Sequence, residues 1–99
     1  MKLVITVEQV KGRCPVYRKG NKIVLDGGYS VNMSETDCIC IHSLSAIMPF
    51  YVALAKGVPP GNMGLARKEN DDGKAYVHCP DVCEITGGGT VIFSIERVE

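Results

Sequence analysis

The sequence predicts an α+β domain of two layers, in which a four-stranded, mostly antiparallel sheet is covered on one face by one main helix. Two observations predict this fold. Four short stretches have the alternating, β-branched pattern of half-buried strands. One longer apolar stretch between the second and third of them repeats with the period of a helix. The order β-β-α-β-β with short connections favours an antiparallel sheet with its helix on one side.

The four predicted strands are residues 2–10, 22–26, 75–79 and 90–98. Alternation in the first and last strands assigns six apolar side chains to the core, namely Leu3, Ile5, Val7, Val91, Phe93 and Ile95. The two terminal strands are the longest, so we expect them to be neighbours in the middle of the sheet.

The main helix is predicted over residues 34–56. Ser34 is a good N-cap residue, and the acidic residues that follow it suit the positive end of the helix dipole. The period assigns five residues to the core face, Cys40, Leu44, Ile47, Tyr51 and Leu54, with Leu44 fully buried and His42, Ser43 and Ala46 on the opposite side. Pro49 should kink or restart this helix. Alternation over residues 38–42 leaves a short extended segment there as the other interpretation.

Composition narrows the class of protein. Ninety-nine residues make one domain, residues 1–99. Eleven basic and eleven acidic residues cancel, so no nucleic-acid or anionic-membrane partner is expected. The first ten residues lack the cleavage site of a signal peptide, and no stretch fits a membrane span. We therefore expect a cytoplasmic protein, in which five cysteines are thiols or metal ligands rather than disulfides.

The apolar character of the central stretch extends around more than one face of the predicted helix. Ile39, Met48, Phe50 and Val52 join the main stripe, whereas a sheet can cover only one side. Surplus apolar surface of this kind is commonly buried between subunits, so a homo-oligomer is expected.

Four separated elements of the sequence resemble those of a family of small prokaryotic proteins with no established activity. The elements are Gly12-Arg13-Cys14-Pro15-Val16-Tyr17, Cys40-Ile41-His42-Ser43-Leu44, Cys79-Pro80-Asp81 and the closing residues 91–97. The resemblance runs nearly from end to end. It draws attention to Cys14, Cys40, Cys79 and Asp81, whereas Cys38 and Cys83 are extra cysteines in this sequence.

Three cysteines form the main candidate site. Cys14 follows the first strand, Cys40 belongs to the central stretch, and Cys79 ends a strand beside Asp81. Together with His42, these residues are candidates for a small-molecule ligand site. The three thiols are also candidate ligands for zinc or an iron–sulfur cluster, although the sequence has no C-x-x-C pair. The alternative is that they pack as small buried hydrophobes.

A reactive thiol is the second chemical hypothesis. Cys38 or Cys40 in the first turn of a helix would have a lowered pKa, with His42 or His78 as the base. Acidic residues beside them oppose that effect. Residues 86–90, Thr-Gly-Gly-Gly-Thr, lead into a strand and are better explained as a permissive turn than as a phosphate loop.

The sequence alone therefore favours a small binding or regulatory protein with a cysteine-lined pocket. The alternatives are a thiol-dependent redox or transferase enzyme, and a structural interaction module in which the cysteines belong to the core.

Overall fold

In the computed structural model, which describes all 99 residues, five strands form one antiparallel sheet. The strands are β1 (Lys2–Gly12), β2 (Lys22–Asp26), β3 (Ser30–Val31), β4 (Ala75–His78) and β5 (Gly89–Val98). The helices are α1 (Ile41–Ile47), α2 (Tyr51–Ala55), the 3₁₀ turn η1 (Pro60–Met63) and α3 (Cys83–Thr86). The α+β class and the antiparallel sheet agree with the sequence prediction, but the strand count does not, because β3 was missed.

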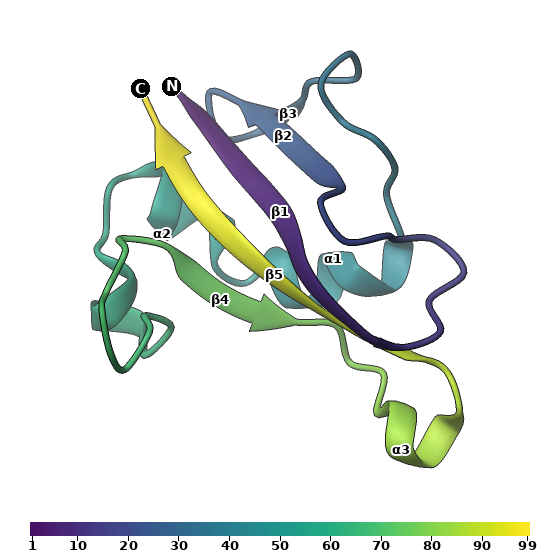
Figure 1. Ribbon diagram of the computed structural model, residues 1–99. Coiled ribbons are helices and arrows are strands. Elements are labelled where there is room, and N and C mark those ends of the chain that lie inside the picture. Colours follow the sequence, from purple (N-terminus) through teal and green to yellow (C-terminus); the bar gives the residue numbers. More distant parts are fainter.

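The sheet has the order β3-β2-β1-β5-β4. The two terminal strands are central neighbours, as predicted, with Lys2 opposite Val98 and Gly12 opposite Gly89. Both chain ends therefore lie at the same end of the sheet (Figure 1). Because β4 is antiparallel to β5, it runs in the same direction as β1. The far ends of β1 and β4 consequently reach the same edge of the molecule.

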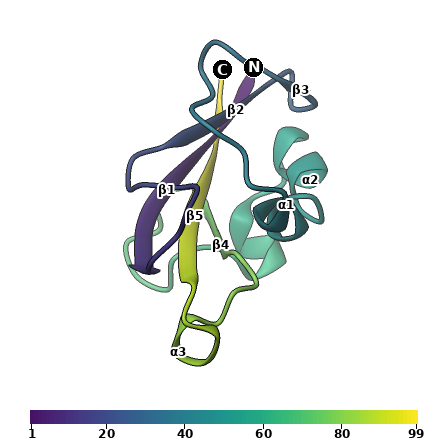
Figure 2. The same ribbon diagram turned by 90° about the vertical axis from the view of Figure 1, so that its right-hand side faces the viewer.

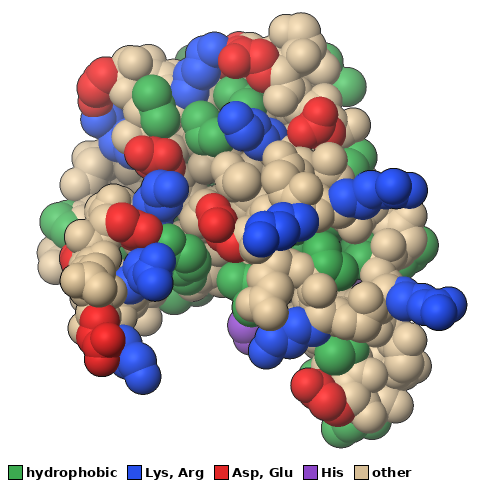
Figure 3. Space-filling view, in the orientation of Figure 1, with side chains coloured by type: hydrophobic (Ala, Val, Ile, Leu, Met, Phe, Trp, Pro, Cys, Tyr) green, Lys and Arg blue, Asp and Glu red, His purple; other side chains and the backbone are tan.

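Helices α1 and α2 cover one face of the sheet, and the other face is open (Figure 2). The core lies between the two layers. The six side chains predicted for it from the terminal strands are at most 2% exposed. On the open face, acidic and basic side chains are interspersed (Figure 3). This distribution explains the strand alternation, since one face meets the helices and the other meets water.

The predicted helix over residues 34–56 is wrong at its start and too long. Residues 34–40 are not helical, and the first helix begins after Cys40, whose backbone is extended. The alternative of an extended segment over residues 38–42 agrees with the backbone of Cys40 but not with residues 41 and 42, which are helical. The predicted interruption at Pro49 is confirmed, because α1 ends at Ile47 and α2 begins at Tyr51, with turn residues between them.

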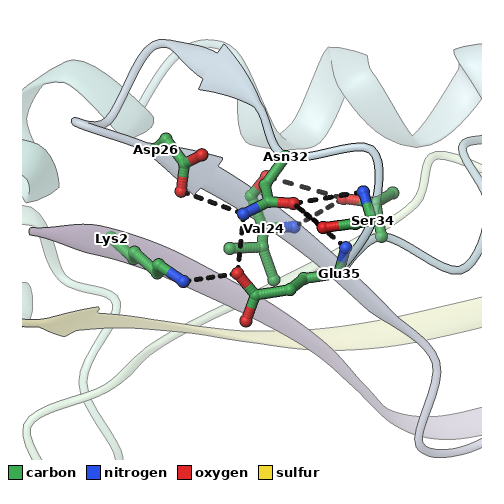
Figure 4. Close-up of polar contacts among 7 residues, drawn as sticks. Lys2, Val24, Asp26, Asn32, Ser34 and Glu35 are labelled. Atoms are coloured by element: carbon green, nitrogen blue, oxygen red, sulfur yellow. Dashed lines mark hydrogen bonds and ion pairs between the residues drawn. The ribbon is translucent and has the colours of Figure 1, made fainter.

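Hydrogen bonding to the edge of the sheet explains why Ser34 does not cap a helix. Asn32 Oδ1 accepts the backbone N–H groups of Ser34 and Glu35 and the Ser34 hydroxyl (Figure 4). Farther along, the backbone N–H of Val24 donates to Thr36 Oγ1 at 3.0 Å. Residues 32–37 thus form hydrogen bonds with backbone groups on the outer edge of β2, which would otherwise be unpaired.

None of the helices has the length and apolar character needed to cross a lipid bilayer.

Candidate functional site

A cavity of about 430 Å³ opens at the end of the sheet farthest from the chain termini. The loop after β1, the start of α1 and the connection from β4 to β5 enclose it. All five residues that the sequence analysis proposed as ligand-binding line this cavity, namely Cys14, Cys40, His42, Cys79 and Asp81. We call it the thiol-lined cavity. In the sequence, Cys14 and Cys40 are 26 residues apart, and Cys40 and Cys79 are 39 residues apart. Because β1 and β4 run in the same direction, Cys14 and Cys79 lie at the same edge of the sheet.

Cys14 lies in the loop that follows β1 and is half-buried. Its Sγ accepts the backbone N–H of Tyr17 at 3.3 Å. The loop lies directly on the start of β5, where a Cβ atom on Gly89 would be 2.6 Å from the Cys14 nitrogen. The absence of a side chain at Gly89 therefore allows β5 to approach Cys14.

Cys79 follows β4 and is 7% exposed. Its sulfur accepts the backbone N–H of Val91 at 3.2 Å and lies 3.5 Å from the carbonyl oxygen of Gly89. Its own N–H donates to the carbonyl oxygen of Val91. Cys79 is thus fixed against β5 and is the most deeply buried of the three cysteines.

Cys40 is placed by a closed network of hydrogen bonds around Tyr17. The backbone N–H of Cys40 donates to the Tyr17 hydroxyl oxygen at 2.8 Å, and the Ser43 hydroxyl donates to the Cys40 carbonyl at 2.7 Å. The Tyr17 hydroxyl, 2.8 Å from Ser43 Oγ, must then donate to that oxygen. This network fixes the start of α1 beside the cavity.

The Tyr17 ring connects this network to the core. It is 3% exposed and packs edge-on against Phe93, with ring centroids 5.3 Å apart. Burial raises the pKa of its hydroxyl, and the hydrogen bond that it accepts from the Cys40 N–H acts in the opposite direction. Sequence reasoning missed Tyr17 and Ser43 as residues of the site. Their only signal was their presence in the elements Cys14-Pro15-Val16-Tyr17 and Cys40-Ile41-His42-Ser43.

Asp81 lies at the opening of the cavity. The Thr86 hydroxyl donates to its Oδ1, and Thr90 Oγ1 donates to its backbone carbonyl at 2.6 Å. Gly88 passes against the carboxylate, so that a Cβ atom there would be 2.4 Å from Oδ2. Gly88 and Gly89 therefore allow close packing around Asp81 and Cys14, which goes beyond the permissive turn that the sequence predicted.

His42 is exposed on α1, and its side chain makes no hydrogen bond within the protein. The other histidine, His78, directs Nδ1 to the carbonyl oxygen of Cys79 at 2.7 Å. Neither imidazole is hydrogen-bonded to a thiol. The geometry needed for a histidine base that activates a cysteine is therefore absent from the structure.

Cys38 does not line the cavity, and its thiol lies 3.5 Å from the carbonyl oxygen of Val16. Burial raises its pKa, and the nearby Asp37, Cys14 and Cys40 raise it further. The hypothesis of a Cys38 thiol activated in the first turn of a helix is thus wrong on two counts. Cys38 precedes the helix, and its surroundings favour the neutral thiol.

The three cavity cysteines do not form a metal-ligand set. The structure contains no group of three or more His, Cys, Asp or Glu side chains placed to hold a metal ion. The residues present therefore do not fit zinc or an iron–sulfur cluster.

A second hollow, of about 250 Å³, lies between α1 and the β2–β3 side of the sheet. All ten residues that line it are hydrophobic, and they include Tyr29, Val31, Leu44 and Met48. We call it the apolar groove. Leu44 was predicted to be fully buried, but it is only half-buried and lines this groove. Ser43, predicted to face away from the core, is 1% exposed.

Comparisons with protein-family models, with curated proteins and with solved structures find no match to this chain. The resemblance to a family of small prokaryotic proteins thus stays a prediction. Any statement about function depends on the geometry of the two hollows.

Proposed function

We propose that the protein binds a small organic molecule in the thiol-lined cavity. The observation that carries this proposal is the convergence of Cys14, Cys40 and Cys79, with His42 and Asp81, on one cavity from segments far apart in the sequence. The volume of about 430 Å³ falls in the range of small-molecule sites. Apolar walls with a few polar groups at fixed positions are also typical of such sites.

Binding is favoured over thiol-dependent redox or transferase catalysis for a geometric reason. Catalysis by a cysteine needs a base or another activating group in contact with the thiol. Neither histidine is hydrogen-bonded to a thiol, so no imidazole base contacts the cavity cysteines. We place this function in the cytoplasm, where thiols stay reduced.

Fragment binding followed by nuclear magnetic resonance tests the proposal. A library of small uncharged and charged organic fragments should shift the backbone signals of residues around Cys14, Cys40 and Asp81. The variant Val16→Trp places a large ring at the cavity, because Val16 lines it and is 38% exposed. It should abolish these shifts. Val98→Trp is the matched control, since Val98 is 39% exposed at the opposite end of the sheet.

The proposal fails if no fragment shifts these signals, or if the shifts persist in Val16→Trp. Retention of the shifts in Val98→Trp shows that the loss is specific to the cavity. A cavity that binds nothing would favour the alternative of a structural module whose cysteines are part of the core.

We further propose that two copies of the chain associate through the apolar groove. No charged residue lines the groove, so a charged partner would lose hydration without gaining an ion pair. Apolar side chains protrude beside it, with Tyr29 82% exposed and Met48 57% exposed. The same face thus offers both a hollow and the side chains to fill it, which is what a twofold interface between identical chains requires.

A further inference from the structure

The electrostatics of the thiol-lined cavity depend on one side chain. Of the twelve residues that line it, only Asp81 carries a formal charge at neutral pH. Asp81 also pairs with no basic side chain. The ion pairs of the chain lie elsewhere and are Lys2–Glu35, Arg67–Asp72 and Arg97–Glu99. The lining of the cavity therefore carries one formal negative charge, and no ion pair of the chain involves it.

The position of this carboxylate is fixed before any ligand arrives. The Thr86 hydroxyl donates to Oδ1 and also accepts the backbone N–H of Gly88 at 3.1 Å. Oδ2, which packs against Gly88, has no hydrogen-bond donor within the protein. One oxygen atom thus holds the group in place, and the other retains its capacity to accept. Binding of a ligand that donates to Oδ2 therefore has no added entropic cost for ordering this side chain.

The residues around Asp81 place no basic side chain in ion-pair contact with it. Asp81 also borders a shallow hollow lined by Lys11, His78 and Glu84, but the Lys11 ammonium is not within ion-pair distance of it. On the cavity side, the other lining groups are thiols, apolar side chains, glycines, hydroxyls and the His42 imidazole. A positive charge brought into the cavity would be attracted by Asp81, and a negative charge would be repelled.

We propose that the ligand of the thiol-lined cavity is a small organic cation, an amine or related nitrogen base with an apolar body. Its charged end lies at Asp81, and its apolar end packs against Val16, Val91 and the cysteines. A divalent metal ion is a poor alternative, because no third ligand accompanies Asp81. This inference rests on the proposed binding function and adds the chemical class of the ligand.

Two thiol reagents of opposite charge and similar size test the inference. They are the trimethylammonium-ethyl and the sulfonatoethyl methanethiosulfonates, which have tetrahedral heads of nearly equal volume. In each case the cysteine thiolate attacks the sulfenyl sulfur, methanesulfinate leaves, and a mixed disulfide forms. The rate at Cys14 and at Cys40, the two half-exposed cavity cysteines, is measured by peptide mapping and mass spectrometry. Dividing the two rates at one cysteine, and then dividing by the same ratio for a small free thiol, cancels the intrinsic reactivity of the cysteine and of the reagents.

In the unmodified chain, the cationic reagent should react faster at these cysteines, by about tenfold, which corresponds to about 1.4 kcal/mol. Asp81→Asn keeps an acceptor for Thr86 but removes the charge, so it should reduce the ratio by about the same factor. Glu69→Gln is the matched control, since it removes an exposed carboxylate outside the cavity and should leave the ratio unchanged. If Asp81→Asn does not fold, raising the salt concentration with the unmodified chain should lower the ratio toward one.

The outcomes separate this inference from the proposed function. A ratio near one in the unmodified chain, or one that is insensitive to Asp81→Asn, would overturn the assignment of a cationic ligand. The proposed binding function would still be supported if Val16→Trp slowed both reagents equally, because access to the cavity would then depend on its space and not on charge. If the cavity cysteines react with neither reagent, the cavity is closed to molecules of this size and the proposed function itself fails.

Discussion

At the scale of single residues, the hydroxyl of Tyr17 fixes more of the site than any other group. It accepts the backbone N–H of Cys40 and donates to Ser43, while its ring packs on Phe93. One side chain from the loop after β1 thus determines where α1 begins. The helical period of the sequence cannot indicate such contacts, because Tyr17 is separated from Cys40 by 23 positions and from Ser43 by 26 positions.

Replacement of this tyrosine by phenylalanine measures the contribution of the hydroxyl. Tyr17→Phe keeps the ring but leaves the N–H of Cys40 and the hydroxyl of Ser43 without this partner. We expect a loss of about 1–3 kcal/mol in the free energy of unfolding, the usual cost of an unsatisfied buried group. Chemical denaturation measures it. Tyr29→Phe is the matched control, because Tyr29 is 82% exposed and its hydroxyl has no partner. A loss equal to that of the control would mean that the network contributes nothing.

The pH dependence of stability should report the same group. Burial raises the pKa of Tyr17, so the folded protein retains its phenolic proton at a pH where the unfolded chain loses it. The contribution is fully present below the unfolded pKa of about 10 and is lost as the pH rises through the folded pKa. We expect the stability of the unmodified chain to fall above pH 10 more steeply than that of Tyr17→Phe. Parallel curves for the two proteins would exclude this effect.

At the scale of secondary structure, the face of the first helix differs from the one that periodicity indicated. The sequence placed Leu44 in the core and Ser43 in water, whereas the structure buries Ser43 and leaves Leu44 half-buried in the apolar groove. The predicted helix also began at Ser34, whereas residues 34–37 are hydrogen-bonded along the edge of β2 (Figure 4). The sequence offers no sign that an edge strand would take precedence over a helix cap.

Two alanine substitutions compare how deeply two residues of α1 are buried. Ile47 is 2% exposed, so Ile47→Ala should cost about 2–5 kcal/mol of the free energy of unfolding. Leu44→Ala should cost less, because Leu44 already borders solvent. Denaturant titration of both variants measures the difference. If Leu44→Ala proves to be the more destabilising, the half-buried position of Leu44 is contradicted.

The close approach of β5 to the loop after β1 gives a further prediction. A Cβ atom at Gly89 would be 2.6 Å from the nitrogen of Cys14 and 2.7 Å from the carbonyl carbon of Arg13, and both are backbone atoms that cannot rotate away. Gly89→Ala should therefore destabilise the fold by about 1–3 kcal/mol, the usual cost of overpacking. It should also alter thiol reactivity at Cys14. In Gly61→Ala, the new Cβ would lie 3.9 Å from the Cβ atom of Ala66, an ordinary contact, so this variant should be tolerated. Equal stability of the two variants would contradict the approach described for β5.

At the scale of the whole molecule, the topology was the most predictable feature. The pairing of the two terminal strands follows from their length and alternation, and the shared edge for Cys14 and Cys79 follows from strand directions. What the sequence lacked was anything local to predict β3, a two-residue strand, or α3, a four-residue helix. Such short elements are specified by contacts with the rest of the fold and not by a period of their own.

Self-association should depend on the apolar groove. Sedimentation velocity should show a dimer at micromolar concentration, and Met48→Glu should convert it to a monomer by placing a charge in the groove. Ile85→Glu is the matched control, since Ile85 is 85% exposed on α3, outside the groove. It should leave the dimer intact. If the unmodified chain is a monomer at high micromolar concentration, the proposal of self-association is contradicted.

The side-by-side termini also determine how the molecule responds to mechanical force. Pulling on the two ends acts on one pair of neighbouring antiparallel strands, across their hydrogen bonds and at one end of the pair (Figure 1). The bonds are then loaded in succession, beginning beside Lys2 and Val98 and travelling toward Gly12 and Gly89. The sheet should therefore unzip at low force instead of shearing, and the strand ends that border the cavity should be the last part of this pair to separate.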